Sequence, residues 1–382
     1  MTELRLLDSL DDIPAADWDA LHDGGHPFLR HAFLAGLERH GCLRAHWGWR
    51  PRHAALYDGD ELVAAAPAYE KSNSHGEFVF DHAWAQAWSR FGLDYYPKWL
   101  VAVPYSPVTG PRLLARDAAT RRNLVDALRT RSDEAAYSSL HLNFLPESEL
   151  DAFDETWLAR GDVQFHWRND AGWQGFDDFL AALDAKKRKN IRQERERVRR
   201  ADVGFRCVHG DEASESDLAA MHAFYCATQQ AYGNHPALTL DFLRHLAETM
   251  PRALLLVLAE RDGKSIAGAL CLRGADTLYG RYWGTEENIA GLHFETCYYQ
   301  GIDYCLREGL RRFEPGAQGE HKIARGFLPV LTHSRHHVAD LRFAEALRPW
   351  CAQERESVLR YRDLVLAHSP YREPPADRPA RT

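Results

Sequence analysis

The sequence has no run of apolar residues long enough to cross a bilayer, because such a span needs about 20 of them in succession. Its first residues, MTELRLLDSLDD, are acidic, whereas a secretory signal begins basic and then turns apolar. These two absences predict a chain with no membrane span and a cytoplasmic location.

Cysteine is sparse: the 382 residues include seven, scattered and odd in number. They lack the paired spacing of a zinc site or a disulfide framework, so we expect reduced thiols in the core. His333 and His337 stand four residues apart, as in a zinc-binding helix, but Pro329 and the β-like run HHVADLRF disfavour a helix there. The sequence therefore predicts no metal site.

A nucleophile elbow is also missing. Ser106 and Ser334 both lack the strand–turn–helix context that presents a catalytic serine in many hydrolases, so a serine hydrolase is not expected. Acidic residues outnumber basic ones, and the formal net charge of −8 argues against a protein that coats DNA. A chain of this length with 45% hydrophobic and 27% charged residues is typical of two globular domains.

The most informative stretch runs from Leu254 to Arg325. Two apolar runs flank Asp262-Gly263, a dipeptide that favours a hairpin because both residues tolerate positive φ. A third strand, TLYGRYWG, follows. Residues 291–308 place apolar side chains at helical spacing, Gly309 stands where a glycine ends a helix, and LRRFEPG predicts one more strand.

The first half repeats this order. A hairpin around Asp58-Gly59 aligns with the later one, a helix is expected over residues 116–136, and SLHLNFLP follows as a strand. The separation of about 170–200 residues indicates an internal duplication. An aromatic-rich segment over about 71–105 is predicted as an insertion in the first half, and its rings are expected to lie mainly in the core.

One predicted helix concentrates positive charge. Lys186 to Arg200 holds nine Lys or Arg and two Glu, a local charge of about +7. A polyanion, either the phosphates of a cofactor or a tRNA stem, is one explanation, and a solvated helix with Glu/Arg pairs is the other. We favour a binding role only for its first part, with Arg188 and Arg192 four residues apart on one face.

Several motifs together resemble one known family. They are KKRKNIR from Lys186, HPFL from His26, YYPK from Tyr95, VPYSPVTG from Val103, FY with Thr228 from Phe224, and EPGAQGEHKIARGF from Glu314. The chain resembles the bacterial FemAB-like predicted N-acyltransferases, a branch of the GNAT superfamily, over roughly residues 20–350.

The resemblance implies an α+β fold of two tandem GNAT-like domains, each a mixed, mostly antiparallel sheet with flanking helices. We expect one over residues 1–168, one over 169–366 that carries the active site, and a disordered tail over 367–382. It also implies transfer of an acyl or aminoacyl group from acyl-CoA or aminoacyl-tRNA to an amine, either a small amine or a cell-wall precursor. The sequence departs from ordinary GNAT enzymes, since neither half has the Gln/Arg-x-x-Gly-x-Gly/Ala loop that holds the CoA pyrophosphate, and WGTEENIAG brings acidic Glu286 and Glu287 instead.

Transfer to an amine requires a base, donors for the oxyanion and a proton for the leaving group. We predict His321 as the base, with Glu320 as its orienting partner or the direct base, and Tyr282 as the proton donor. The predicted substrate- and phosphate-binding residues are Arg188, Asn190, Arg192, Gln318, Lys322 and Arg325. The alternative function is a non-catalytic scaffold of the same fold or an RNA-binding module.

Overall fold

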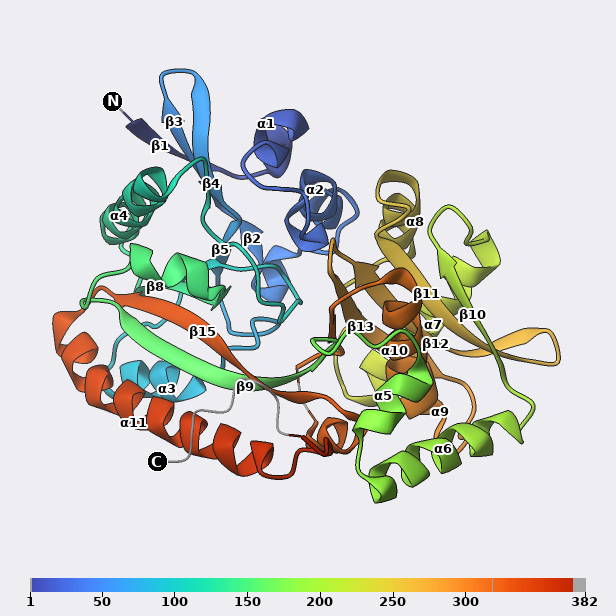
Figure 1. Cartoon of the computed structure of the whole chain (residues 1–382). Helices are drawn as coiled ribbons and strands as arrows, with labels where there is room; N and C mark the ends of the chain where they lie inside the picture. The colour runs from blue at the N-terminus through green and yellow to red at the C-terminus, as the bar shows by residue number, and fades with distance from the viewer. Residues whose placement is uncertain (1, 318, 374–382) are drawn as a thin grey trace. The chain divides into compact units, whose positions relative to one another are not determined.

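The structure is a computed structural model that describes residues 2–317 and 319–373 (Figure 1). The described residues divide into two compact units. Unit 1 comprises residues 2–162, 237–242 and 331–359, and unit 2 comprises 163–236, 243–330 without residue 318, and 360–373. The first junction, at 162/163, lies close to the predicted boundary at 168/169, but unit 1 also takes residues 237–242 and 331–359 from beyond it.

The strands of unit 2 form a mixed sheet in the order β10-β11-β12-β13-β14-β9. Neighbours are antiparallel except β13 and β14, which are parallel. The strands are β9 (Leu158–Arg168), β10 (Gly204–His209), β11 (Leu254–Arg261), β12 (Lys264–Arg273), β13 (Thr277–Thr285) and β14 (Arg312–Glu314). The helices are α5 (Phe176–Ala182), α6 (Ala185–Arg199), α7 (Glu215–Ala231), α8 (Leu240–Thr249), which begins in unit 1, α9 (Leu292–Phe294) and α10 (Gln300–Glu308).

The predicted hairpin of unit 2 is confirmed. Asp262 and Gly263 have φ of 51° and 73°, the pair of positive values that a type I′ turn requires. The third strand, the glycine cap at Gly309 (φ 70°) and the strand after it are also as predicted. The predicted continuous helix over 291–308 is wrong in one respect, because a π-helical turn, Glu295–Tyr299, interrupts it.

Unit 1 repeats this topology in a broken form. Its strands β2-β5-β6-β8-β15 have the same relative directions as β11-β12-β13-β14-β9, and in both orders the third and fourth strands form the parallel pair. The hairpin β3–β4 leaves this sheet and forms a second one, β1-β3-β4-β7. Pro51 and Pro67 stand at the two points of departure, where a residue without an N–H cannot continue the ladder.

The strands of unit 1 are β1 (Thr2–Leu7), β2 (Arg50–Pro51), β3 (His53–Asp58), β4 (Glu61–Ala66), β5 (Ala68–Lys71), β6 (Lys98–Val101), β7 (Leu114–Ala115), β8 (Ser139–Leu145) and the end of β15 (Leu328–Val338). The helices are α1 (Ala15–Asp19), α2 (His31–Arg39), α3 (His82–Arg90), α4 (Ala118–Glu134) and most of α11 (Leu341–Leu366). The segment 71–105, predicted as an insertion, includes β6, which is a central strand. The repeated unit is therefore larger than the sequence suggested.

Part of the predicted disordered tail is ordered. Tyr371 stacks on Trp173 with ring centroids 5.9 Å apart, and its hydroxyl donates to the Gly326 carbonyl oxygen at 2.7 Å. The prediction of disorder is therefore wrong for residues 367–373, because an aromatic side chain anchors them to unit 2. Residues 374–382 lie outside the described residues.

Helix α7 packs closely on the middle of the unit 2 sheet. Glycines permit this approach: a Cβ on Gly284 would lie 2.1 Å from the carbonyl oxygen of Phe224, and one on Gly268 would lie 2.9 Å from the sulfur of Met221. The first clash is with helix backbone, which cannot move aside as a side chain can.

We therefore expect Gly284→Ala to lower the free energy of unfolding by about 1–3 kcal/mol or more, the cost of overpacking a filled core. Gly204→Ala in β10 is the matched control, since its nearest atom would be Glu260 O at 3.9 Å. Thermal or denaturant unfolding of the two variants measures the difference. Equal stabilities would contradict this account of the α7 contact.

Candidate functional site

The site in unit 2 begins where two parallel strands part. The pairing of β13 with β14 ends at Tyr279 and Glu314. Beyond that point β13 continues, while the chain after β14 turns away through Pro315 and Gly316, whose φ is 99°. A cavity of about 310 Å³ opens between them, lined by residues of α7, β12, β13, the π-helical turn and the loop after β14.

A β-bulge shapes the β13 wall of this cavity. Leu270 pairs with Tyr282 and Cys271 pairs with Gly280, so Arg281 is the extra residue. A bulge releases one residue from the ladder and bends the strand. Gly280 through Trp283 all line the cavity. A Cβ on Gly280 would lie 3.3 Å from Pro315 Cα, so glycine lets the loop after β14 approach here.

The π-helical turn supplies the opposite wall. Single π turns inside α-helices are often found at functional sites, because the wider turn redirects side chains. Cys297 and Tyr298, both in this turn, line the cavity. The Tyr298 hydroxyl lies 2.8 Å from Nε2 of His321, which belongs to the short 3-10 helix Glu320–Arg325.

Besides Arg281, three basic side chains line the cavity. Burial lowers the pKa of Lys322 to about 8, and its Nζ donates to the Gly316 carbonyl oxygen at 2.7 Å. Burial, together with the nearby positive groups, lowers the pKa of His293 to about 4 and also lowers that of His321. At neutral pH the two imidazoles are therefore uncharged bases beside a single ammonium.

The structure brings three of the predicted residues together, because His321, Lys322 and Tyr282 line this one cavity. Glu320 is not part of its lining: its Oε1 accepts a hydrogen bond from the Tyr361 hydroxyl at 2.7 Å. Gln318 lies outside the described residues.

Arg325 has a different environment from the predicted one. Its guanidinium makes two hydrogen bonds to the Glu194 carboxylate, at 2.6 and 3.1 Å, and its Nη1 donates to the His321 carbonyl oxygen at 2.7 Å. Tyr299 also donates to Glu194. Arg325 therefore ties the 3-10 helix that carries His321 to α6, and a second anion would have to compete with Glu194.

The predicted basic residues Arg188, Asn190 and Arg192 lie on α6, outside the cavity lining. Asn190 and Arg192 are exposed and Arg188 is half-buried, and Arg192 comes within 3.8 Å of Asp177. They form part of a basic face on the first two turns of α6.

Sequence reasoning missed His293 and Cys297 as site residues and placed Tyr298 only on a buried helix face. His293 lies before the π-helical turn, and helical periodicity carries no signal for such a turn. The bulge at Gly280 was the one hint available, since glycine within a strand often marks a bulge.

The family of this chain follows from its sequence. Residues 9–373 match the FemAB-like family, which is described as peptidoglycan biosynthesis/recognition. This chain belongs to the FemAB-like family.

Solved structures of similar fold place this FemAB-like chain in the α+β class that the sequence predicted. FemX is 11% identical, with 88% of this chain and 98% of that chain covered at a TM-score of 0.52. The C-terminal domain of a putative lysylphosphatidylglycerol synthetase from Agrobacterium fabrum is 13% identical, with 87% and 93% covered at 0.52. A conserved protein of unknown function from Bacteroides thetaiotaomicron is 11% identical, with 87% and 99% covered at 0.51. No curated protein matches the sequence.

The described part of this FemAB-like chain lacks two features. No helix there has the length and apolar character needed to cross a membrane. No group of three or more His, Cys, Asp or Glu side chains in the same residues is arranged to hold a metal ion.

The depressed pKa of Lys322 predicts a pH-dependent stability. Between the folded pKa of about 8 and the model-peptide value of 10.5, the unfolded chain binds more protons, so stability rises with pH in this window. The free energy of unfolding of the wild type, minus that of Lys322→Met, should increase by on the order of 2 kcal/mol between about pH 7.5 and about pH 9.5.

Denaturant titrations at both pH values measure this difference. Lys264→Met, which removes an exposed lysine at the start of β12, is the matched control. If the free energies of unfolding of wild type and Lys322→Met changed equally between the two pH values, the pKa of Lys322 would not be depressed in the folded protein.

Proposed function

We propose that this protein is an acyl- or aminoacyltransferase that joins its acyl group to an amine in the unit 2 cavity. The observation that carries the proposal is the Tyr298–His321 hydrogen bond, which lies beside buried Lys322 in a cavity opened by parting parallel strands. Family membership supports a transferase, and the description of the family favours a peptidoglycan precursor or a related small amine as acceptor.

The Tyr298–His321 pair suits the deprotonation of an amine. Burial raises the pKa of Tyr298 above its ordinary value, so the phenol keeps its proton and can donate it to Nε2 of neutral His321. As the amine attacks, its proton passes to the Tyr298 oxygen while the Tyr298 proton passes to His321. The new C–N bond then forms without a charged amine in the cavity.

The other requirements fall to neighbouring groups. Lys322 and the bulge residues Gly280–Tyr282 line the same cavity, and we assign the stabilisation of the oxyanion to the Lys322 ammonium and to backbone amides of the bulge. As the intermediate collapses, the bond from carbon to the thiol or ribose oxygen breaks, and the Tyr282 hydroxyl gives the leaving group its proton. In this scheme Glu320 holds the 3-10 helix through Tyr361 and does not touch the substrate.

The donor is proposed to bind along α6. Arg188, Asn190 and Arg192 would contact the phosphates of acyl-CoA or of an aminoacyl-tRNA, since a polyanion is attracted to such a basic face. Glu194 on the same helix is bonded to Arg325, so the donor-binding helix and the 3-10 helix that carries His321 are mechanically joined. A cytoplasmic location would follow from either donor.

The exposed basic face of α6 also favours a second candidate, an RNA-binding module without catalysis. The two are distinguished by offering the protein acyl-CoAs, charged tRNAs and uncharged tRNA. Transfer of a labelled acyl group to any amine acceptor supports the enzyme. Binding of uncharged tRNA that is lost in Arg188→Ala/Arg192→Ala, with no transfer from any donor, supports the RNA-binding module.

For the transferase we expect His321→Ala to lower turnover by about 10²–10⁴-fold, the usual contribution of a positioned acid–base group. The assay follows acyl transfer to peptidoglycan-precursor peptides and small amines by mass spectrometry. His368→Ala, which changes an exposed histidine after α11, is the matched control and should keep the wild-type rate. Equal rates in His321→Ala and the wild type would place the chemistry elsewhere.

A further inference from the structure

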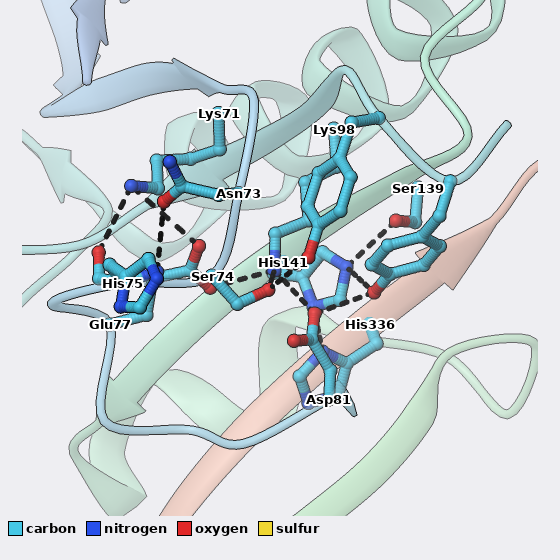
Figure 2. Close-up of polar contacts among 12 residues, drawn as sticks. Lys71, Asn73, Ser74, His75, Glu77, Asp81, Lys98, Ser139, His141 and His336 are labelled. Carbon is cyan, nitrogen blue, oxygen red and sulfur yellow. Dashed lines mark hydrogen bonds and ion pairs between the residues drawn. The ribbon is translucent and has the colours of Figure 1, made fainter. Parts of the chain in front are cut away.

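A buried chain of hydrogen bonds runs through unit 1 and includes none of the residues that the proposed function uses. The Tyr95 hydroxyl donates to Asp81 at 2.6 Å and lies 3.2 Å from His141 Nε2. His141 and His336 meet through their Nδ1 atoms at 2.7 Å, and His336 Nε2 lies 2.8 Å from the Ser334 hydroxyl oxygen. Figure 2 shows this cluster from Asp81 to His336.

One end of the chain is a carboxylate held in its ionised form. Burial raises the pKa of Asp81, but the Lys98 ammonium and the hydrogen bonds from Lys98, Ser74 and Tyr95 together lower it by more, so Asp81 stays charged. Lys98 is fully buried and also bonds Glu77 at 2.8 Å and Ser74 at 3.1 Å. The charged end of the chain is therefore fixed.

This fixed end sets the direction of every proton in the chain. A carboxylate only accepts, so Tyr95 gives its one proton to Asp81, and its oxygen accepts from Nε2–H of His141. Neutral His141 then has its lone pair on Nδ1, which requires a proton on Nδ1 of His336. Neutral His336 has its lone pair on Nε2 and accepts the proton of Ser334. Burial keeps both imidazoles neutral by holding their pKa values well below the ordinary one.

The opposite orientation is disfavoured. It would set the lone pair of His141 Nε2 against the Tyr95 oxygen at 3.2 Å, because the only Tyr95 proton is directed to Asp81. Ser139 also lies 2.8 Å from the same nitrogen, but its hydroxyl can donate or accept, so the Tyr95–Asp81 bond is the contact that sets the orientation. Ser334 is thus bonded to a base that is oriented from behind, the arrangement that activates a serine nucleophile.

Ser334 also lines a cavity. This cavity of about 350 Å³ is enclosed by residues of unit 1 alone, with the rings of Phe78, Phe80, Phe144 and Trp350 among its walls. Such walls fit an apolar or aromatic acyl group.

The same cavity contains an unsatisfied donor. Arg160 lines it and is buried, and two of its nitrogens bond Glu354 at 2.7 Å each. Its third, Nη1, is buried and has no hydrogen-bond partner among the described residues. A buried donor left without a partner costs free energy, so it is suited to a ligand oxygen.

The geometry points to Ser334 as a nucleophile that accepts an acyl group from an activated ester or thioester in this cavity, with His336 as its base and Arg160 Nη1 as a donor to the acyl oxygen. Asp81, Tyr95 and His141 are positioning residues, since they fix the tautomer of His336 without touching the acyl group.

The step balances without any further reactant. The Ser334 oxygen bonds to the carbonyl carbon as its proton moves to His336 Nε2, and the tetrahedral intermediate collapses by breaking the bond to the leaving thiol or alcohol, which takes that proton. Water or an amine then attacks the acyl-serine, gives a proton to His336, and releases the acid or amide as Ser334 regains its proton. This activity is independent of the transfer proposed in unit 2.

The test treats the full-length protein with a fluorophosphonate probe, which forms an oxygen–phosphorus bond with an activated serine and releases fluoride. We expect labelling of one site, mapped to Ser334 by peptide mass spectrometry, and its loss in Ser334→Ala. Ser132→Ala, which changes another buried serine of unit 1, is the matched control and should label like the wild type. Wild-type protein that is unlabelled, or labelled only at other residues, would overturn the proposal whether or not the variant folds.

A second measurement tests the positioning residues. Hydrolysis of a p-nitrophenyl ester should show a kcat at least about tenfold lower in Tyr95→Phe with KM little changed, because His336 loses its fixed tautomer while the cavity stays the same. A Tyr95→Phe variant that melts at a lower temperature but keeps the wild-type kcat would show that the hydrogen-bond chain only stabilises the fold.

Discussion

Both units depend on one constraint, a pair of parallel strands inside an otherwise antiparallel sheet. Parallel neighbours cannot be joined by a tight turn, so a crossover of a dozen or more residues must connect them, and here it holds a helix. In unit 2 the crossover from β13 to β14 contains the π-helical turn and α10, and in unit 1 the crossover from β6 to β8 contains α4.

The path of the chain at the end of the parallel pair differs between the two units. In unit 2 the chain after β14 turns away at Pro315 and Gly316, and the cavity with His321 lies in the space that opens. In unit 1 the segment after β6 stays against β8, since Gly110 N–H donates to the Phe144 carbonyl oxygen. Buried Arg112 then bonds the carbonyls of Gly110 and Val108 within that segment. The same topology therefore supports a cavity in one unit and a closed loop in the other.

In unit 1 a cluster of buried ionisable groups lies between the main sheet and α3, and not at the end of the parallel pair. Lys98 on β6, His141 on β8 and His336 on β15 come from three adjacent strands and point to one face. A buried polar network of this kind is costly unless its members are mutually satisfied. The directed hydrogen bonds from Ser334 to Asp81 meet part of that demand, since Asp81 Oδ1 and Glu77 Oε1 have no hydrogen-bond partner among the described residues, and they also leave a base next to a hydroxyl.

Local signals determined much of the fold. The Asp-Gly turns, the strands, Gly309 and the duplicated order of elements follow from backbone preferences that act over a few residues, whereas the α+β class came from the resemblance to the family. The motif from Glu314 to Phe327 carried the family, and it placed His321 and Lys322 in the loop where the cavity lies.

The tertiary structure alone decided the rest. Strand β9 pairs with β14 in unit 2, and β15 pairs with β8 in unit 1. Both pairings join residues more than a hundred positions apart, and hydrophobic periodicity carries no information about such pairing. Arg325 was predicted to bind an anion, and the partner that it contacts in the fold, Glu194, lies 131 positions away in the sequence. Ser334 lacked any local nucleophile signature, because its base His336 is oriented by His141, Tyr95 and Asp81, which come together only when the chain folds.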